Sequence, residues 1–232
     1  MKKTLYLLLA CSLFIACGKK LQPTEKSTVI GVNNTMPGDS TIYGLACDGC
    51  TDSILILLPY TGGDPDTFDI IQAFVKHRLY GRPHVGDKLA VILSNDSTRE
   101  VSKAINISTL RGYWSYQVVP TLRHSAQSLP PLPDSIRQRI MTPREYGLTL
   151  KTGGEAYSRG YYRTTGNEGM SPVVYPQVKR YTHWYLWNGL IILQTDSASH
   201  QQPDTASILL LRRDSLVLRF SDHEQAYYRK KE

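Results

Sequence analysis

The stretch YTHWYLWNGLIILQT, residues 181–195, carries the strongest fold signal in the chain. Two runs of aromatic and branched apolar residues flank Asn188-Gly189, and such runs favour extended backbone. Asn-Gly is a residue pair preferred in two-residue type I′ turns, whose twist matches that of a β-hairpin. The stretch therefore predicts two antiparallel strands, 181–187 and 190–195, joined by a tight turn.

Side chains alternate between the two faces of a strand, which sorts the first run into two sets. One set has aromatic rings with polar tips: Tyr181, His183, Tyr185 and Trp187. The other set contains Thr182, Trp184 and Leu186. Either set can fill a barrel core or cover its outside, and the first can also bind an amphipathic ligand. We take the first set, together with Trp114 and Tyr116 on an earlier strand, as the candidate ligand-binding residues.

Strand-like runs continue on both sides of this hairpin through residues 106–232. They span 110–119, 146–152, 156–163, 207–213, 216–220 and 225–230. Turn-forming pairs such as Gly153-Gly154 and Asp214-Ser215 separate them, so neighbouring runs are expected to form hairpins. A proline-rich stretch, 120–143, interrupts the series and contains a short helical run at 134–141. This meander predicts an antiparallel barrel.

The preceding segment, 41–105, also consists of short strand-like runs. They lie at 41–46, 54–58, 67–74 and 88–93, between turns rich in Gly, Asp and Pro. Several short strands in a small segment indicate a small closed or half-closed barrel of the OB or SH3 type. The predicted fold is all-β with minimal helix, a small OB/SH3-like barrel followed by a larger antiparallel barrel. The alternative is one continuous β-fold that includes both halves.

Cys47 and Cys50 form a Cys-x-x-Cys pair, which is typical of a redox centre, half of a zinc site or a small disulfide. No second Cys pair completes a zinc site. Asp48-Gly49 favours a two-residue turn that places the two cysteines opposite each other, about 5.5 Å apart at Cα and within disulfide range. In an oxidising compartment we expect a disulfide here. Free thiols, or redox or metal work, are the alternatives.

The first 16 residues are predicted to be a signal peptide, because two lysines precede an apolar run too short to span a bilayer. Phe14-Ile15-Ala16-Cys17 resembles the bacterial lipobox, which implies cleavage before Cys17 and lipidation of that cysteine. The polar segment 17–40 is expected to be the lipidated N-terminus and tether. In Bacteroides-type bacteria, an acidic cluster directly after the lipidated cysteine resembles a surface-export signal. The residues after Cys17, Gly18-Lys19-Lys20, lack such a cluster. We therefore expect an outer-membrane lipid anchor on the periplasmic side.

Composition excludes disorder throughout, because 41% of the residues are hydrophobic and 20% are charged. The formal net charge is +7, and removal of Lys2 and Lys3 with the signal peptide leaves +5. Residues 106–232 carry 16 basic and 10 acidic side chains, so the surplus lies in that half. It is either a solvated barrel rim or a surface for an anionic partner. No nucleic-acid partner is expected outside the cytoplasm.

No sequence motif for catalysis is present. The chain has no Gly-x-Ser-x-Gly elbow, Walker loop, zincin motif, dinucleotide fingerprint or EF-hand loop. Its six histidines are scattered, and turn chemistry explains carboxylates such as Asp64 and Asp66. We therefore expect a protein that is not an enzyme and that has no cofactor or metal.

Several short motifs occur in an order that resembles the lipocalin-like domains of Bacteroidetes lipoproteins. They are Gly112-Tyr113-Trp114, Leu148-x-Leu150, Gly153-Gly154-Glu155-Ala156, Trp184-x-Leu186, Asp214 to Leu218, and Tyr227-Tyr228-Arg229. The resemblance covers residues 106–232 and implies a lipocalin-like barrel. The proline-rich insertion and the N-terminal barrel depart from the family pattern.

Two functions are consistent with these features. In the first, the C-terminal barrel of a periplasmic lipoprotein binds a small hydrophobic or anionic ligand, and segment 120–143 covers its mouth. In the second, two filled barrels form an envelope module that contacts another protein or a glycan. An open cavity of a few hundred Å³ favours the first function, and a solidly packed barrel favours the second.

Overall fold

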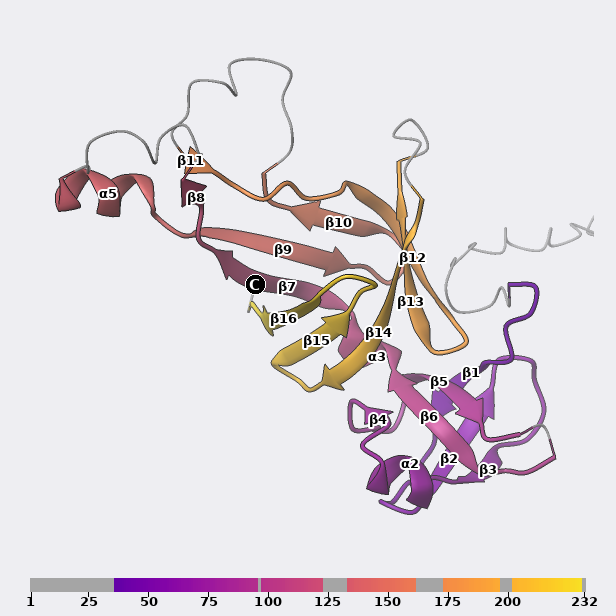
Figure 1. The fold of residues 1–232 in the computed structure, drawn as a ribbon. Coiled ribbons are helices and arrows are strands. Elements are labelled where there is room, and N and C mark those ends of the chain that lie inside the picture. Colours follow the sequence, from indigo (N-terminus) through magenta and orange to yellow (C-terminus); the bar gives the residue numbers. More distant parts are fainter. Residues whose placement is uncertain (1–35, 96, 123–132, 162–172, 197–201, 231–232) are drawn as a thin grey trace, which may run out of the picture.

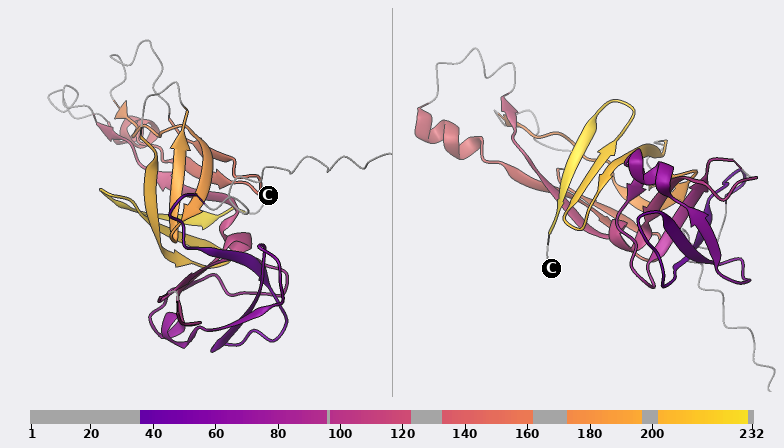
Figure 2. Two further views of the ribbon diagram at one scale, coloured as in Figure 1. Left: turned by 90° about the vertical axis from the view of Figure 1, so that its right-hand side faces the viewer. Right: turned by 90° about the horizontal axis from the view of Figure 1, so that it is seen from below.

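The computed structural model describes residues 36–95, 97–122, 133–161, 173–196 and 202–230 (Figure 1). These residues form two large β-sheets, one two-stranded sheet and three short helices. Two further views show the first sheet, in indigo and magenta, beside one end of the second sheet (Figure 2). The prediction of an all-β chain with minimal helix is confirmed.

The first large sheet uses residues 42–106 in the strand order β3-β2-β1-β5-β6-β4. Its strands are β1 (Ile42–Ala46), β2 (Ile54–Pro59), β3 (Asp66–Asp69), β4 (Leu79–Tyr80), β5 (Lys88–Leu93) and β6 (Val101–Asn106). At the end of β3, the Asp69 N–H donates to the Arg99 carbonyl at 2.9 Å, next to the start of β6. This contact brings strands from opposite halves of the sheet together, so the sheet is partly closed.

The predicted strand 67–74 is wrong beyond Asp69. Strand β3 ends there, and helix α2 (Ile71–Val75) follows. The Asp69 carboxylate accepts a hydrogen bond from the Ile71 N–H at 2.8 Å, which offers the backbone an alternative to extended pairing. Ala73 is the buried residue of this helix, so most of α2 faces away from the core.

The loop between β1 and β2 differs from the predicted two-residue turn. Cys47 and Cys50 are free thiols, and the predicted disulfide is not formed. The Cys47 N–H donates to the Ile56 carbonyl at 2.9 Å, so Ile56 rather than Cys50 lies opposite Cys47. A type I′ turn needs positive φ at both central residues. Gly49 has a φ of +87°, but Asp48 does not have a positive φ.

The second large sheet is a nearly closed antiparallel barrel built from residues 112–229. Its strands are β7 (Gly112–Val118), β9 (Arg144–Leu150), β10 (Ala156–Arg159), β12 (Tyr181–Trp187), β13 (Leu190–Thr195), β14 (Asp204–Leu211), β15 (Ser215–Arg219) and β16 (Glu224–Arg229). Consecutive strands of this sheet pair except β10 and β12, and β7 also pairs with the last strand, β16. This is the up-and-down order expected of a meander.

The barrel has one gap in its strand pairing, between the edge strands β10 and β12. The gap is narrowed at one end, where the Trp184 N–H donates to the Gly154 carbonyl at 2.7 Å. An isolated bridge between Glu155 and His183 adds to this contact. The two edges therefore meet, although they do not form a continuous ladder.

The hairpin predicted at Asn188-Gly189 is confirmed. The two residues have φ values of 47° and 72°, as a type I′ turn requires, and Trp187 lies opposite Leu190. The turn also contacts the first half of the chain, because the Asn188 N–H donates to the Asp39 carboxylate at 3.0 Å. The hairpin tip therefore helps to fix the barrel against the N-terminal sheet.

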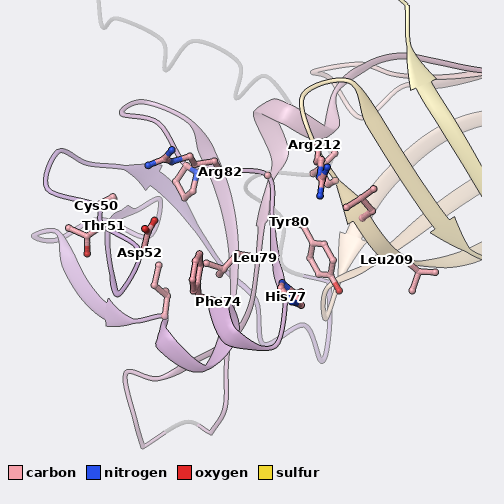
Figure 3. A pocket seen from close by; sticks show the side chains of 15 residues that line it. Cys50, Thr51, Asp52, Phe74, His77, Leu79, Tyr80, Arg82, Leu209 and Arg212 are labelled. Carbon is pink, nitrogen blue, oxygen red and sulfur yellow. The ribbon is translucent and has the colours of Figure 1, made fainter.

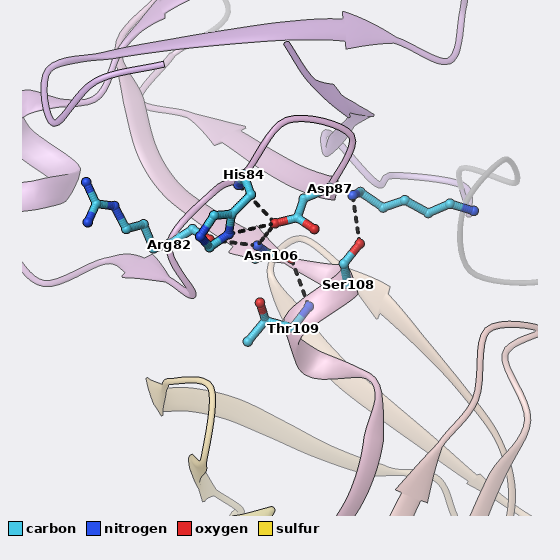
Figure 4. Close-up of polar contacts among 7 residues, drawn as sticks. Arg82, His84, Asp87, Asn106, Ser108 and Thr109 are labelled. Carbon is cyan, nitrogen blue, oxygen red and sulfur yellow. Dashed lines mark hydrogen bonds and ion pairs between the residues drawn. The ribbon is translucent and has the colours of Figure 1, made fainter. Parts of the chain in front are cut away.

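Helix α3 (Ile107–Leu110) connects the two large sheets, and Asn106 organises the connection (Figure 4). Asn106 is only 1% exposed. Its side-chain oxygen accepts the Thr109 N–H at 2.8 Å, and its amide donates to the Arg82 carbonyl at 2.9 Å and the Asp87 carboxylate at 2.7 Å. The buried amide thus joins helix α3 to the loop before β5, and its polar atoms are paired, as those of buried polar groups generally are.

The two large sheets share one buried apolar cluster. Tyr43, Ile105 and Leu110 from the first half belong to the same cluster as Trp184 and Leu186 of the barrel. The predicted boundary between 41–105 and 106–232 falls at the end of β6. The sheets therefore use separate stretches of chain but are packed against each other.

The predicted helical run at 134–141 is α5 (Asp134–Ile140), and none of its residues is buried. It projects away from the barrel near the two-stranded sheet of β8 (Thr121–Leu122) and β11 (Val173–Val174) (Figure 1). This part of the proline-rich stretch does not cover the barrel. Residues 123–132 lie outside the described part of the chain.

Candidate ligand-binding site

The barrel end beside the first sheet is closed by Trp114. Its side chain is fully buried, and its indole N–H donates to the Leu110 carbonyl at 2.8 Å. The Arg229 guanidinium covers the indole face, with 4.1 Å between Cζ and the ring centroid. Arg229 also donates to the Arg111 carbonyl at 2.7 Å and to the Thr109 carbonyl. Protein groups therefore pair the polar atoms of the Trp114 and Arg229 side chains, and Trp114 acts as a packing residue; the neighbouring Arg111 has buried Nε and Nη2 atoms without a partner among the described residues.

The barrel interior next to Trp114 is filled by large apolar side chains. Those that are buried in one cluster include Leu148, Leu150, Trp184, Leu186, Ile191, Leu193, Ile208, Leu216 and Leu218. Protein interiors of this kind are close-packed and leave few voids larger than a water molecule. A pocket of about 500 Å³ beside Arg111 and Gly112 is open to solvent at this end, and further open space lies at the other end of the barrel.

A pocket of about 250 Å³ lies at that open end, which we call the mouth. Tyr116, Tyr181 and Tyr227 line it. The rings of Tyr116 and Tyr227 meet edge to face, with 5.2 Å between their centroids, and Tyr116 meets Tyr146 in the same way at 5.7 Å. Edge-to-face pairs are favourable for aromatic rings, so the neighbouring rings hold one another in place.

The hydroxyl groups of the three mouth tyrosines differ in their partners. Tyr181 donates to an Asp204 carboxylate oxygen at 2.7 Å, and the Lys179 ammonium pairs with the other oxygen. The hydroxyl groups of Tyr116 and Tyr227 have no hydrogen-bond partner among the described residues. Tyr227 is only 6% exposed. Tyr227 lines the pocket and its hydroxyl has no protein partner there, so this hydroxyl is a position where a ligand atom can bind.

The mouth keeps these phenols neutral. Burial raises the pKa of Tyr116, Tyr181 and Tyr227 above the usual value for tyrosine. For Tyr181, the hydrogen bond to Asp204 and its negative charge raise the pKa further. The three hydroxyls are therefore protonated at physiological pH and can donate hydrogen bonds.

The rim of the mouth does not carry a positive surplus. Lys179 faces two carboxylates, Asp204 and Asp222, around the same pocket. His223 lies 2.7 Å from Asp222 through Nδ1 and stacks on the Phe220 ring, with 4.9 Å between the centroids. This charge arrangement favours an uncharged ligand over an anion.

A β-bulge decides which side chains of β12 face the mouth. Tyr181 pairs with Thr195, but His183 pairs with the adjacent Gln194, so Thr182 is the extra residue. The bulge reverses the alternation at this point. Tyr181 consequently packs against the same core cluster as Trp184.

Of the six predicted ligand-binding residues, the structure brings Tyr116 and Tyr181 together in the mouth. Trp114 lies at the closed end instead. His183, Tyr185 and Trp187 are partly exposed and lie on the outer side of β12, because the buried side chains of this strand are Trp184 and Leu186. The predicted face was therefore the outer one, apart from Tyr181.

Sequence reasoning missed three important mouth residues: Tyr227, Asp204 and Phe220. Tyr227 belongs to the terminal Tyr-Tyr-Arg motif, and its spacing of two from Arg229 places both on one face of β16. That spacing could have identified Tyr227 once Arg229 was known to point inward. Asp204 and Phe220 lie at or beyond strand ends, where alternation gives no signal.

The basic surplus of the barrel half is distributed rather than gathered in one patch. Arg229 is packed on Trp114, and burial lowers its pKa. Lys179 pairs with Asp204, and Lys230 pairs with Glu145 at 2.8 Å. Part of the positive charge is therefore neutralised locally.

Within the described ranges, no group of three or more His, Cys, Asp or Glu side chains is placed to hold a metal ion. None of the helices described has the length and apolar character to cross a membrane. The predicted signal peptide and Cys17 lie outside the described residues.

No family model, curated protein or solved structure matches the chain.

Proposed function

We propose that this protein is an outer-membrane lipoprotein, held on the periplasmic side through lipidated Cys17, whose lipocalin-like barrel binds a small ligand without catalysing a reaction. The lipobox-like sequence at 14–17 supports the anchor. The strand order of the barrel and its tyrosine-lined mouth support the binding role. The anchor would keep the mouth within tether reach of the membrane.

One observation carries the binding proposal: Tyr227, which is only 6% exposed, lines a pocket, and its hydroxyl has no hydrogen-bond partner among the described residues. The nearby hydroxyl of Tyr116 is also without such a partner. Two unpartnered donors between apolar rings form a site with an apolar wall and a polar end, which is the usual composition of a ligand pocket.

The mouth favours a small, uncharged molecule that has an apolar face and at least one hydrogen-bond acceptor. Its volume of about 250 Å³ is near the lower end of small-molecule sites. The aromatic rings of Tyr116 and Tyr227 would contact the apolar face. Asp204 and Asp222 disfavour an anionic ligand, so of the two predicted ligand classes the hydrophobic one fits this pocket better.

The second candidate function is an envelope interaction module that contacts a protein or a glycan. The filled interior around Trp114 and Trp184 favours it, because most of the barrel has no room for a ligand. The two candidates make different predictions about the mouth, since an interaction module does not need open hydroxyls there.

Native mass spectrometry of the lipoprotein purified from its own envelope separates the two candidates. We expect a small bound mass on the wild-type protein that is lost or strongly reduced in Tyr227→Phe and Tyr116→Phe. Tyr185→Phe is the matched control, because it removes the same atom from the outer face of β12 and should keep the bound mass.

Three outcomes count against mouth binding. They are an absence of any co-purifying molecule, equal loss in Tyr185→Phe, and retention in the double variant of Tyr116 and Tyr227. Circular dichroism of each variant confirms that the fold is retained, so that loss of the ligand reports on the site itself.

A further inference from the structure

A second and larger pocket, of about 700 Å³, lies between the first sheet and the barrel (Figure 3). We call it the groove. The Gly81 N–H donates to the Leu211 carbonyl at 3.1 Å, which joins its two sides. Gly81 has a φ of +79°, and a Cβ atom there would lie 2.8 Å from the Asn106 side chain. Glycine therefore permits the close approach that forms the groove.

The groove is separate from the mouth, although strand β14 contributes to both. Asp204 at the start of β14 lines the mouth, and Leu211 at its end lines the groove. Seven residues of extended chain separate them by about 23 Å, at about 3.3 Å per residue. A ligand bound in the mouth therefore does not contact a ligand bound in the groove.

A β-bulge in β14 supplies one apolar wall of the groove. The register shifts between Ile208 and Leu210, and the buried positions on either side are Ile208 and Leu211. Leu209 and Leu210 are consequently partly exposed neighbours that both line the groove. Without the bulge, Leu210 would follow Ile208 into the barrel core.

Helix α2 supplies a second apolar wall. Phe74 lines the groove and is 49% exposed, and its neighbour Val75 is 63% exposed. Leu79 lies beside Phe74 in Figure 3. Gathered exposed apolar side chains of this kind mark a binding surface more often than scattered ones do.

The polar side chains of the groove are mainly cationic. Arg82 and Arg212 lie along one edge, across from the aromatic rings (Figure 3). Neither guanidinium forms a hydrogen bond or ion pair with any residue in the described ranges. Asp52 supplies the one carboxylate on the lining, so the arginines give the groove a net positive charge. Guanidinium groups bind planar carboxylates through paired hydrogen bonds.

His77 also lines the groove, and its backbone is strained. It has a φ of 54°, a conformation that favours glycine. It occupies the C′ position of a Schellman motif, because its N–H donates to Phe74 and the Arg78 N–H donates to Ala73. Glycine is the usual residue here, so the histidine costs stability and places an imidazole at the groove.

We infer that the groove binds an amphipathic carboxylate, with its apolar body between α2 and β14 and its acid group at Arg212, while Arg82, whose guanidinium points away from Arg212 (Figure 3), adds to the positive charge of the same edge. Charge complementarity selects the anionic head, and Phe74 and Leu209 select the apolar body. The inference does not rest on the proposed function of the mouth, because the two pockets share no residue. It assigns the anionic ligand class to the groove and the uncharged class to the mouth.

Calorimetric titration of the full mature chain, with Cys17→Ser to avoid detergent, tests this site with decanoate as the probe. We expect decanoate to bind about tenfold or more tightly than decanol, since charge-assisted hydrogen bonds are lost with the alcohol. Arg212→Gln should weaken decanoate binding by about fivefold to tenfold, and Arg82→Gln should weaken it less, because Arg82 contributes charge without contacting the acid group. Arg213→Gln is the matched control, because it removes the adjacent exposed guanidinium outside the groove.

His77→Gly gives a second, independent readout. We expect it to raise the melting temperature, because it removes the strained backbone, and to weaken decanoate binding less than Arg212→Gln does, because it removes one ring from the lining but leaves the cation in place. The proposed carboxylate site in the groove would be contradicted by equal affinities for decanoate and decanol. Equal effects of Arg212→Gln and Arg213→Gln on decanoate affinity would also contradict it. So would loss of decanoate binding in Tyr227→Phe, which would place the probe in the mouth.

Discussion

At the closed end of the barrel, Trp114 has its indole N–H bonded and its face covered by Arg229, whereas at the open end Tyr227 lines a pocket and its hydroxyl has no partner in the described chain. Both residues are large, aromatic and buried. They differ in whether the protein itself completes their polar contacts. Trp114 is therefore expected to contribute mainly to stability, and Tyr227 mainly to binding.

The same contrast explains why burial alone does not identify a ligand site. Trp114 is more buried than Tyr116 and sits in a stronger motif, yet it has no open space beside it. Tyr116 is only partly buried, but it faces a pocket with a free hydroxyl. A ligand site is better indicated by a polar atom that has no protein partner and lies next to a pocket.

The largest expected effect is that of Trp114→Ala. Removal of a fully buried indole should lower the free energy of unfolding by about 3–5 kcal/mol, through lost burial and the cavity left behind. Urea denaturation followed by circular dichroism measures this change. A loss below about 1 kcal/mol would show that the closed end does not hold the barrel together.

Arg229→Met tests the cover over Trp114. It keeps much of the apolar stem but removes the donors to the Thr109 and Arg111 carbonyls, and we expect a loss of about 2–3 kcal/mol. Arg219→Met is the control, since Arg219 forms an exposed pair with Glu224 that is worth at most about 1 kcal/mol. Equal losses in the two variants would contradict a special role for Arg229.

Alkaline pH should weaken the fold through the tyrosines. The folded-state pKa values of Tyr116, Tyr181 and Tyr227 are raised, so the unfolded chain releases these protons first, near pH 10. Stability is therefore fully present below about pH 10 and falls as pH rises above it. Denaturation between pH 8 and 11 measures the slope, and Tyr227→Phe should make it shallower.

The smallest expected effect on stability is that of Tyr227→Phe at neutral pH. Because the hydroxyl has no protein partner, its removal should change the free energy of unfolding by less than about 1 kcal/mol. Loss of bound ligand should be large in comparison. A loss of several kcal/mol in the ligand-free protein would mean that the hydroxyl is part of the core.

Much of the fold follows from local sequence signals. Asn188-Gly189 specifies its turn because both residues tolerate positive φ, and the series of hairpins then gives the barrel. The site follows less well, because alternation does not show which face of β12 points inward, and the bulge at Thr182 turns only Tyr181 of the predicted residues on this strand toward the mouth. Before the helix at Ile71–Val75, the Asp69 carboxylate accepts the Ile71 N–H. In the Cys47–Cys50 loop, the Cys47 N–H donates to the Ile56 carbonyl. These are contacts that periodicity does not report.

The most direct measurement of the central claim is NMR of protein with ¹³C-labelled tyrosine rings, purified from its own envelope and compared with the same protein refolded after its ligand is removed. We predict that the ring signals of Tyr116, Tyr181 and Tyr227 change between the two samples. Those of Tyr185 and Tyr228, on the outside of the barrel, should stay the same. Identical spectra, or changes confined to the outer tyrosines, would contradict a ligand site in the mouth.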